Sequence, residues 1–239
     1  MAGSIEAIAA AGLREAADRA LYVQYGSGLS CPPGWINFDV SPLLRLQRLP
    51  VIRTLFKRGP TVFPDGVRFG DIVSGLPIAD ASVDGIYASH VLEHLSHEDF
   101  WKALRNTYRL LKPGGRFRLI VPDLEARARG YLQRLDRGAH DANDWFVEVL
   151  GMGARQRARG VGGAIRAAVG NSAHLWMWDE RSLQGALEQV GFVHVRRCQF
   201  NDSADQAFRA VEDRLRFRDD HHAIDECAME AERPAARTA

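Results

Sequence analysis

The sequence has few cysteines, no long apolar run and no secretory leader pattern. Its 239 residues include only three cysteines, Cys31, Cys198 and Cys227, and no C-x-x-C pair. An odd number of widely spaced cysteines argues against a disulfide framework and against a cysteine-rich zinc site. No run of about 18 apolar residues occurs, so we expect no membrane-spanning helix. The first twenty residues lack a basic start and an unbroken apolar core, and we expect a cytoplasmic protein.

The sequence also lacks an excess of charge of one sign. Its 31 basic residues are balanced by 30 acidic ones, which disfavours bulk nucleic-acid binding. The distribution is uneven, because residues 40–64 and 149–178 carry several arginines and no acid, whereas acids cluster between 202 and 232. Two solvated helical faces would explain the basic stretches. The alternative is a basic surface that receives an anionic acceptor or makes transient contact with an anionic membrane.

Strand-like and helix-like segments alternate along the chain. Short apolar runs predict strands at residues 20–25, 35–39, 67–71, 83–88, 116–121, 192–200 and 224–231. Helical spacing predicts helices within residues 5–17, 43–58, 89–111, 124–170, 179–190 and 204–217. This alternation indicates an α/β doubly wound sheet, in which a ligand lies beyond the carboxyl ends of the strands.

A glycine turn, Tyr25-Gly26-Ser27-Gly28, follows the first predicted strand. Glycines there let the backbone approach a ligand closely. Asp39 ends the next strand, where a carboxylate can accept both hydroxyls of a ribose. Nicotinamide dehydrogenases share this layout, but the G-x-G-x-x-G pattern is missing because Cys31 stands where the last glycine would be.

The middle of the chain carries a more specific pattern. The block Leu76-Pro-Ile-Ala-Asp80-Ala-Ser-Val-Asp84 is followed by Val91-Leu-Glu-His-Leu95 and then by Leu111-Lys-Pro-Gly-Gly115. With the glycine turn and the Trp35–Asp39 strand, this order resembles class I S-adenosylmethionine-dependent methyltransferases, in particular small methyltransferases with a "GWIN-D" second strand. The resemblance covers about residues 20–233 and is weakest between 125 and 170.

The resemblance implies a Rossmann-like sheet of seven strands with the last one antiparallel, and S-adenosyl-L-methionine as cofactor. It implies that the glycine turn lines the methionine portion, that Asp39 holds the ribose and that Asp71, in the loop after the third strand, faces the adenine. Ser89 and His90 would flank the cofactor and the transferred methyl group. The cofactor-contacting set is therefore Tyr25, Gly26, Ser27, Gly28, Asp39, Asp71, Ile72, Ser89 and His90.

One departure concerns the first crossover. Only six residues separate Gly28 from Trp35, fewer than a crossover helix between parallel strands needs. We therefore expect a shortened first crossover, with the helix at residues 5–17 packed in the vacated place. The chain reads as one domain: a cofactor-binding core at 20–124, a Gly- and Arg-rich helical lid at 125–172, the remaining sheet at 173–233 and a frayed tail at 234–239.

Three side chains are candidate general bases: His90, Asp123 and His174. A base assists methyl transfer to a hydroxyl or an ammonium. Each has a structural alternative, since His90 and Asp123 stand at predicted helix starts and His174 lies among tryptophans. The H-x-x-E-H pattern at residues 90–94 also fits a zinc peptidase. The methyltransferase motifs on either side explain the same residues, so we expect no metal site.

The acceptor is expected to be a small or saccharide-type molecule, possibly anionic. DNA-base methylation is disfavoured, because no N/D-P-P-Y follows the fourth strand and no Pro-Cys pair supplies a nucleophile. The other interpretation is a cofactor-binding module that has lost catalysis and acts through partners, as the shortened crossover suggests. The sequence does not define the oligomeric state.

Overall fold

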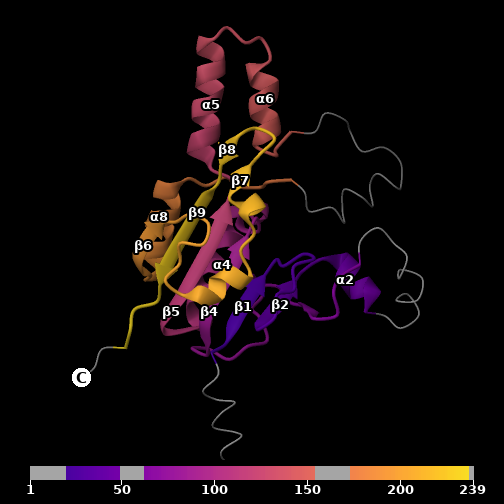
Figure 1. Cartoon of the computed structure of the whole chain (residues 1–239), viewed down its shortest axis with the longest axis vertical. Coiled ribbons are helices and arrows are strands. Elements are labelled where there is room, and N and C mark those ends of the chain that lie inside the picture. The colour runs from indigo at the N-terminus through magenta and orange to yellow at the C-terminus, as the bar shows by residue number, and fades with distance from the viewer. Residues whose placement is uncertain (1–19, 49–61, 154–172, 237–239) are drawn as a thin grey trace, which may run out of the picture.

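A seven-stranded sheet forms the centre of the computed structural model, which describes residues 20–48, 62–153 and 173–236 (Figure 1). The strand order is β3-β2-β1-β4-β5-β9-β6. The strands are β1 (Tyr22–Tyr25), β2 (Trp35–Asp39), β3 (Val67–Phe69), β4 (Val83–Ser89), β5 (Leu111–Val121), β6 (Val193–Arg197) and β9 (Cys227–Glu232). Only β9 runs antiparallel to its neighbours β5 and β6. The predicted fold class is confirmed, including the antiparallel last strand.

Helices α4 (His97–Leu110) and α8 (Glu180–Val190) supply apolar side chains to one face of the sheet. The side chains of Phe100, Leu104 and Leu187 on these helices are fully buried. Ser96 caps α4 by accepting a hydrogen bond from the Asp99 amide. Helix α8 begins with a reciprocal capping box between its N-cap aspartate and the serine three residues later.

The opposite face carries a second apolar cluster, centred on Trp35, Tyr87 and Phe208. The segment that covers it was predicted to be a helix over 204–217, and that prediction is wrong: it forms two short 3-10 turns, η2 (Gln206–Ala210) and η3 (Arg214–Arg216). Asp205 and Asp213 each accept an amide hydrogen bond from the residue two positions ahead. Such local side-chain bonds compete with a continuous helix.

A buried arginine in β5 ties this segment to the sheet. The guanidinium of Arg118 is fully buried and donates to Glu212, to Glu230 and to Asp202, the latter two at 3.1 and 2.9 Å. A buried charge is stable only when it is paired in this way. The network therefore fixes residues 199–212 over the sheet without a helix.

The Lys-Pro-Gly-Gly motif was expected as a turn between a helix and a strand. It lies instead within the range of β5, at an irregularity where Val83 pairs with Leu111 but Gly85 pairs with Arg116. Residues 112–115 therefore bulge out of the ladder. A proline lacks the amide that a central ladder needs, which accounts for the bulge.

Helices α5 (Leu124–Asp136) and α6 (Ala142–Val149) project as an antiparallel pair beyond the carboxyl end of β5 (Figure 1). A short hairpin, β7 (Arg218–Asp219) and β8 (Ile224–Asp225), lies beside them. The strand predicted over 224–231 is thus divided between β8 and β9, and β7 was not predicted. The helix pair occupies the first part of the expected lid. Residues 154–172, its remainder, lie outside the described residues, so the lid and the proposed subdivision of the chain stay predictions.

The first crossover is short, as predicted. Residues 26–34 contain no helix, and β1 still pairs in parallel with β2. Helix α2 (Pro42–Gln47) accounts for the start of the helical segment expected at 43–58. The helix expected at residues 5–17 lies outside the described residues. No helix within the described ranges is long and apolar enough to cross a membrane.

Candidate active site

The glycine turn after β1 lies against the loop that follows β4. Gly26 has a φ of +63°, and a Cβ added to it would stand 2.1 Å from Cγ2 of Val91. Gly28 has a φ of +55°, but a Cβ added there would meet nothing within 4 Å. Gly26 therefore provides a close backbone contact, whereas Gly28 borders open space. The two positions require glycine for different reasons.

Asp39 connects this turn to the end of β2. Its Oδ2 accepts a hydrogen bond from the Gly28 amide at 2.8 Å, and its Oδ1 accepts one from the Ser41 amide at 2.7 Å. The residue is 9% exposed. Each carboxylate oxygen has a second lone pair. Asp39 can thus hold the turn in place and still accept a hydrogen bond from a ligand hydroxyl.

Asp71, after β3, is fixed in a similar way, because its carboxylate accepts from the Val73 amide and from Ser74 Oγ, both at 2.8 Å. It lines a cavity of about 460 Å³ between the loop after β2 and the loop after β3, with Val40 on the opposite side. Ile72 beside it is buried. The cavity is large enough for a planar heterocycle.

Other predicted contact residues lie deeper. The side chain of Tyr25 is buried, with its hydroxyl 3.2 Å from Thr107 Oγ1, so only its backbone can face a ligand. Ser27 is 3% exposed, and its Oγ has no hydrogen-bond partner among the described residues. A buried hydroxyl rarely lacks a partner in folded proteins, so Ser27 is a fit partner for a polar group of a ligand. Ser89 ends β4 and is half-buried.

His90 has a strained backbone, with a φ of +55°. Its Nε2 lies 3.0 Å from the Arg216 carbonyl oxygen, and its Nδ1 lies 3.3 Å from Glu93 Oε1. Burial opposes protonation of the ring, but the contact with the Glu93 carboxylate outweighs it, and the pKa of His90 is raised. His90 stands directly before Val91, the residue that touches the glycine turn.

Asp123 is held by its neighbours. The side chain is the N-cap of α5, with Oδ1 accepting from the Ala126 amide, and Oδ2 accepts from Arg197 at 2.8 Å. His174 Nδ1 lies 2.7 Å from the Leu150 carbonyl oxygen. Burial lowers the pKa of His174. The structure thus brings His90 and His174 near Glu93, whereas Asp123 is engaged in helix capping.

A second cavity, of about 700 Å³, lies between α5, α6 and the β7–β8 hairpin. Arg129, Arg134 and Arg137 of α5 and the loop after it line one side, and Trp145 and His222 line another. The sequence analysis placed its basic surfaces at 40–64 and 149–178 and missed this one. The sequence does contain a sign of this cavity, because four arginines, Arg127, Arg129, Arg134 and Arg137, lie close together. Acidic residues also lie in this segment, so it does not stand out as basic.

The cysteines are not candidates for nucleophilic catalysis. Burial raises the pKa of Cys198 and of Cys227 to about 12, so both remain protonated thiols at neutral pH. Cys31 is exposed. A thiolate mechanism therefore has no support at the carboxyl end of the sheet.

One set of metal-binding side chains converges near this site. Glu93, His94 and His174 each place a donor atom within 4.8 Å of the others'. The sequence analysis considered His90 and His94 as a ligand pair, whereas the structure pairs His94 with His174, 80 residues later. Only the tertiary fold brings these residues together.

Comparison with known proteins points to methyltransferases. A family model described as "Methyltransferase domain" matches residues 51–119, less than a third of the chain. This match confirms the resemblance to class I methyltransferases predicted from the sequence motifs. A search of curated proteins finds no match to the sequence.

Several solved structures are similar to this chain at low identity. One is a chain of the complex containing the Haloferax volcanii Trm112 methyltransferase activator, with 15% identity, a TM-score of 0.47, and coverage of 90% of this chain and 83% of that one. Another is a SAM dependent methyltransferase from Archaeoglobus fulgidus, with 16% identity, a TM-score of 0.46, and coverage of 95% and 93%. "PigF with SAH" has 18% identity and a TM-score of 0.43; this chain covers only 50% of it and is itself covered to 90%. The fold assignment rests on the strand order of this chain itself.

Proposed function

We propose that this protein binds S-adenosyl-L-methionine at the carboxyl ends of β1–β4 and transfers its methyl group to a small or saccharide-type acceptor. The observation that carries the proposal is the arrangement of Asp39. Its carboxylate anchors the glycine turn at Gly28 and retains lone pairs beside the open space above that glycine. The match of residues 51–119 to a methyltransferase domain supports the same activity.

The described residues fit the proposed cofactor part by part. Asp39 would accept the ribose hydroxyls, and the cavity beside Asp71 would receive the adenine. The unpartnered hydroxyl of Ser27 would gain a polar partner from the methionine portion. The cofactor supplies a sulfonium that activates the methyl group. The protein's task is in-line positioning, which can contribute about 7–11 kcal/mol.

His90 is our candidate for the general base because it adjoins the proposed cofactor site. It follows β4 directly and stands beside the residue that contacts the glycine turn. Its ring nitrogens lie 3.0 Å from the Arg216 carbonyl oxygen and 3.3 Å from Glu93 Oε1, so one of these contacts must open before the ring can accept a proton. Asp123 is engaged as a helix cap and in an ion pair, and Nδ1 of His174 faces the Leu150 carbonyl oxygen. A positioned base contributes about 10²–10⁴-fold. We propose His90 for this role, and we regard Asp123 and His174 as the less favoured candidates.

The cavity beside α5 and α6 has a mixed lining with a slight basic excess, since Asp123, Glu125 and Asp225 lie among its arginines. Three arginines from α5 and its C-terminal loop line it, and Trp145 offers an apolar surface on which a sugar or an aromatic ring could stack. Arg134 already lies over the Trp145 ring, 4.4 Å from its centroid. We propose that the charged part of the acceptor binds here.

The test is methyl transfer from labelled S-adenosyl-L-methionine to small-molecule and saccharide fractions of a cell extract. We expect label in a low-molecular-weight product, and at least a 100-fold lower rate for His90→Ala. Transfer by wild type that persists unchanged in His90→Ala would remove His90 from the mechanism. Binding of the cofactor without any transfer would favour the alternative, a non-catalytic module that acts through partners.

A further inference from the structure

Glu93 is a buried carboxylate that faces histidine rings. Its side chain is 0% exposed, and neither oxygen accepts a hydrogen bond from a backbone amide or a hydroxyl among the described residues. Burying an ionised carboxylate is costly unless a cation or hydrogen-bond donors compensate it. The nearest basic atoms are His90 Nδ1 at 3.3 Å and His94 Nε2 at 3.8 Å from Oε1. The carboxylate therefore needs a partner that the described side chains supply only in part.

The two histidines beside Glu93 are oriented by backbone carbonyl groups. His94 Nδ1 lies 3.1 Å from the Ala173 carbonyl oxygen, and His174 Nδ1 lies 2.7 Å from that of Leu150. A carbonyl oxygen can only accept, so each Nδ1 carries the proton and each Nε2 of the neutral ring offers a lone pair. Metal-binding histidines are oriented in this way by a bond from their other nitrogen.

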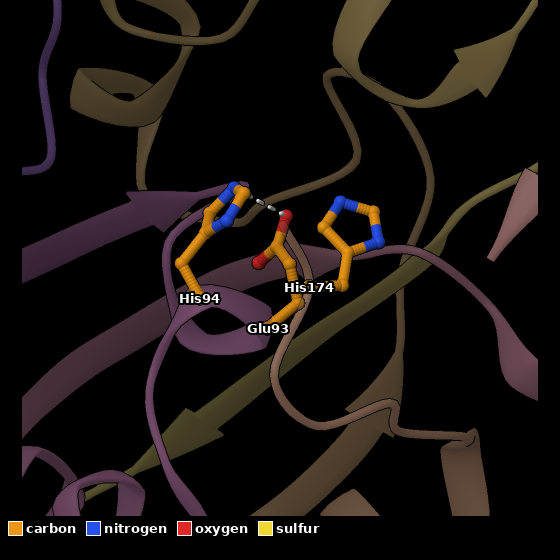
Figure 2. A group of neighbouring side chains, drawn as sticks. All are labelled: Glu93, His94 and His174. Atoms are coloured by element: carbon orange, nitrogen blue, oxygen red, sulfur yellow. Dashed lines mark ion pairs between the residues drawn. The ribbon is translucent and has the colours of Figure 1, made fainter. Parts of the chain in front are cut away.

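Without a cation, the Nε2 lone pairs of the two neutral histidine rings would lie close to the negative charge of the Glu93 carboxylate. Figure 2 shows the Glu93 carboxylate standing between the rings of His94 and His174. The two ring centroids are 5.0 Å apart, and the donor atoms of the three side chains all lie within 4.8 Å of one another. Tetrahedral zinc with bonds of about 2.0–2.2 Å places its donors about 3.3 Å apart. Small rotations of the side chains would close the set around one ion.

The backbone holds the three ligands together before any ion binds. The amides of Leu175 and Trp176 donate to the Glu93 carbonyl oxygen at 2.8 and 3.2 Å, so the His174 segment is attached to the 3-10 turn η1 (Leu92–His94). The His174 amide also donates to the Gly151 carbonyl oxygen at 3.1 Å. This fixed geometry lowers the entropic cost of assembling a ligand set.

The charges around the cluster also allow a cation. The nearest group that can carry a positive charge is His90, whose Nδ1 lies 3.3 Å from Glu93 Oε1, so an ion there would compete with His90 for the carboxylate. Arg127 is a second positive side chain near His174. Its guanidinium is paired with Glu226 through contacts of 2.8 and 3.0 Å. This pair offsets the repulsion that a free arginine would exert. The side chains of His94 and Glu93 are 19% and 0% exposed, so the site is closed on the glutamate side and open on the histidine side.

We propose that Glu93, His94 and His174 bind a divalent transition-metal ion. Two imidazoles and a carboxylate suit zinc or manganese, and three protein ligands leave a position open, as in catalytic rather than structural sites. That position would take an oxygen of the acceptor, a part of the proposal that rests on the proposed methyl transfer. The metal binding itself does not.

The test uses the full chain without an affinity tag, stripped with a chelator and titrated with ZnCl₂ by calorimetry and with MnCl₂ by electron paramagnetic resonance. We expect one ion per chain, at least 100-fold weaker binding for His174→Ala and for His94→Ala, and loss of binding for Glu93→Gln. The exposed His140 gives the matched control, and His140→Ala should bind the metal as wild type does.

Circular dichroism of each metal-free variant checks that it is folded, and Glu93→Gln, which keeps the side-chain shape, serves if an alanine variant does not fold. Wild type that binds neither ion above the level of Glu93→Gln would overturn the proposal. So would binding that His94→Ala and His174→Ala leave unchanged. Because metal binding is measured without cofactor or acceptor, either result is separate from failure of methyl transfer.

Discussion

The carboxylates near the ends of β2 and β3 and the carboxylate in the loop after β4 differ in how their oxygens are hydrogen-bonded. On the first side, near β2 and β3, Asp39 and Asp71 each accept two hydrogen bonds, which come from backbone amides and the Ser74 hydroxyl. On the second side, after β4, Glu93 is more deeply buried and faces His90 and His94 at 3.3 and 3.8 Å, without a backbone donor. A carboxylate bound by backbone amides shapes a site before its ligand arrives, because the loop is already fixed. A buried carboxylate left without backbone donors indicates where a cation or ligand completes the structure.

The two sides meet where Gly26 touches Val91, the residue next to His90. The turn that would receive the cofactor is therefore in direct contact with the segment that carries His90 and Glu93. A substitution that displaces the glycine turn should therefore also shift the loop after β4, and the reverse. The predictions below separate the two sides, beginning with the largest expected effect.

Replacing Asp39 should affect the cofactor side most strongly. Asp39→Ala removes the acceptor for two ribose hydroxyls and two loop amides, and hydrogen bonds to a charged group contribute about 1.5–3 kcal/mol each. We expect S-adenosylhomocysteine to bind at least about 100-fold more weakly, measured by calorimetry. Asp80→Ala, at an exposed aspartate paired with Arg109, is the matched control and should bind as wild type does. Unchanged binding in Asp39→Ala would show that the site is misplaced.

The two glycines of the turn should respond differently. Gly26→Ala places a Cβ against Val91 at a positive φ, and overpacking together with left-handed strain should cost about 2–4 kcal/mol of unfolding free energy. Gly28→Ala meets no atom and should cost only the strain, about 1–2 kcal/mol, while the added methyl fills space proposed for the cofactor.

Denaturant unfolding and calorimetry together check this pair of variants. Adding Val91→Ala to Gly26→Ala should restore part of the lost stability, because it removes the clashing methyl group. Equal destabilisation by the two alanines, with no rescue, would contradict the close contact between the glycine turn and the loop after β4.

Metal should stabilise the folded protein only when the carboxylate of Glu93 is present. A ligand that binds only the folded state adds about 2.7 kcal/mol when it is present at 100 times its dissociation constant. We expect ZnCl₂ to raise the melting temperature of chelator-treated wild type and not that of Glu93→Gln. In metal-free buffer Glu93→Gln should be at least as stable as wild type, because it removes an incompletely compensated buried charge. A metal-free variant that melts well below wild type would show that Glu93 is already satisfied.

Asp123 should show the smallest effect, because its carboxylate acts within the protein. Asp123→Ala removes the cap of α5 and should cost about 0.5–2 kcal/mol in denaturant unfolding, whereas Asp123→Asn keeps a capping side chain and should cost less. Methyl transfer by Asp123→Asn should stay within a few-fold of wild type. A loss as large as that of His90→Ala would make Asp123 the base.

The sequence predicted the elements that follow local rules. The strands from Tyr22 to Val121 are apolar runs that end in turn residues, and Ser96 marks the start of α4, so their positions were readable. The segment at 204–217 was misread because its conformation depends on Arg118, which lies in a distant strand and binds Glu212 and Asp202. Helical spacing alone does not reveal such a partner.

The candidate site was predictable to a similar extent. Asp39 and the glycine turn could be paired from their spacing, because parallel neighbours place their carboxyl ends together. The convergence of His174 on Glu93 could not be predicted, since helices α4, α5 and α6, strand β5 and residues 154–172 separate these positions in the chain. The H-x-x-E-H pattern was visible, but the position of His174 beside it depends on the docking of residues 173–176 on η1.

Calorimetry of the wild-type chain with S-adenosylhomocysteine and, in parallel, with a nicotinamide dinucleotide tests the central claim most directly. Both ligands carry an adenosine ribose that Asp39 could bind, but only the first matches the short glycine turn and the methyltransferase motifs. The proposed function predicts binding of one S-adenosylhomocysteine per chain and none of the dinucleotide. Absence of S-adenosylhomocysteine binding, or tighter binding of the dinucleotide, would contradict it.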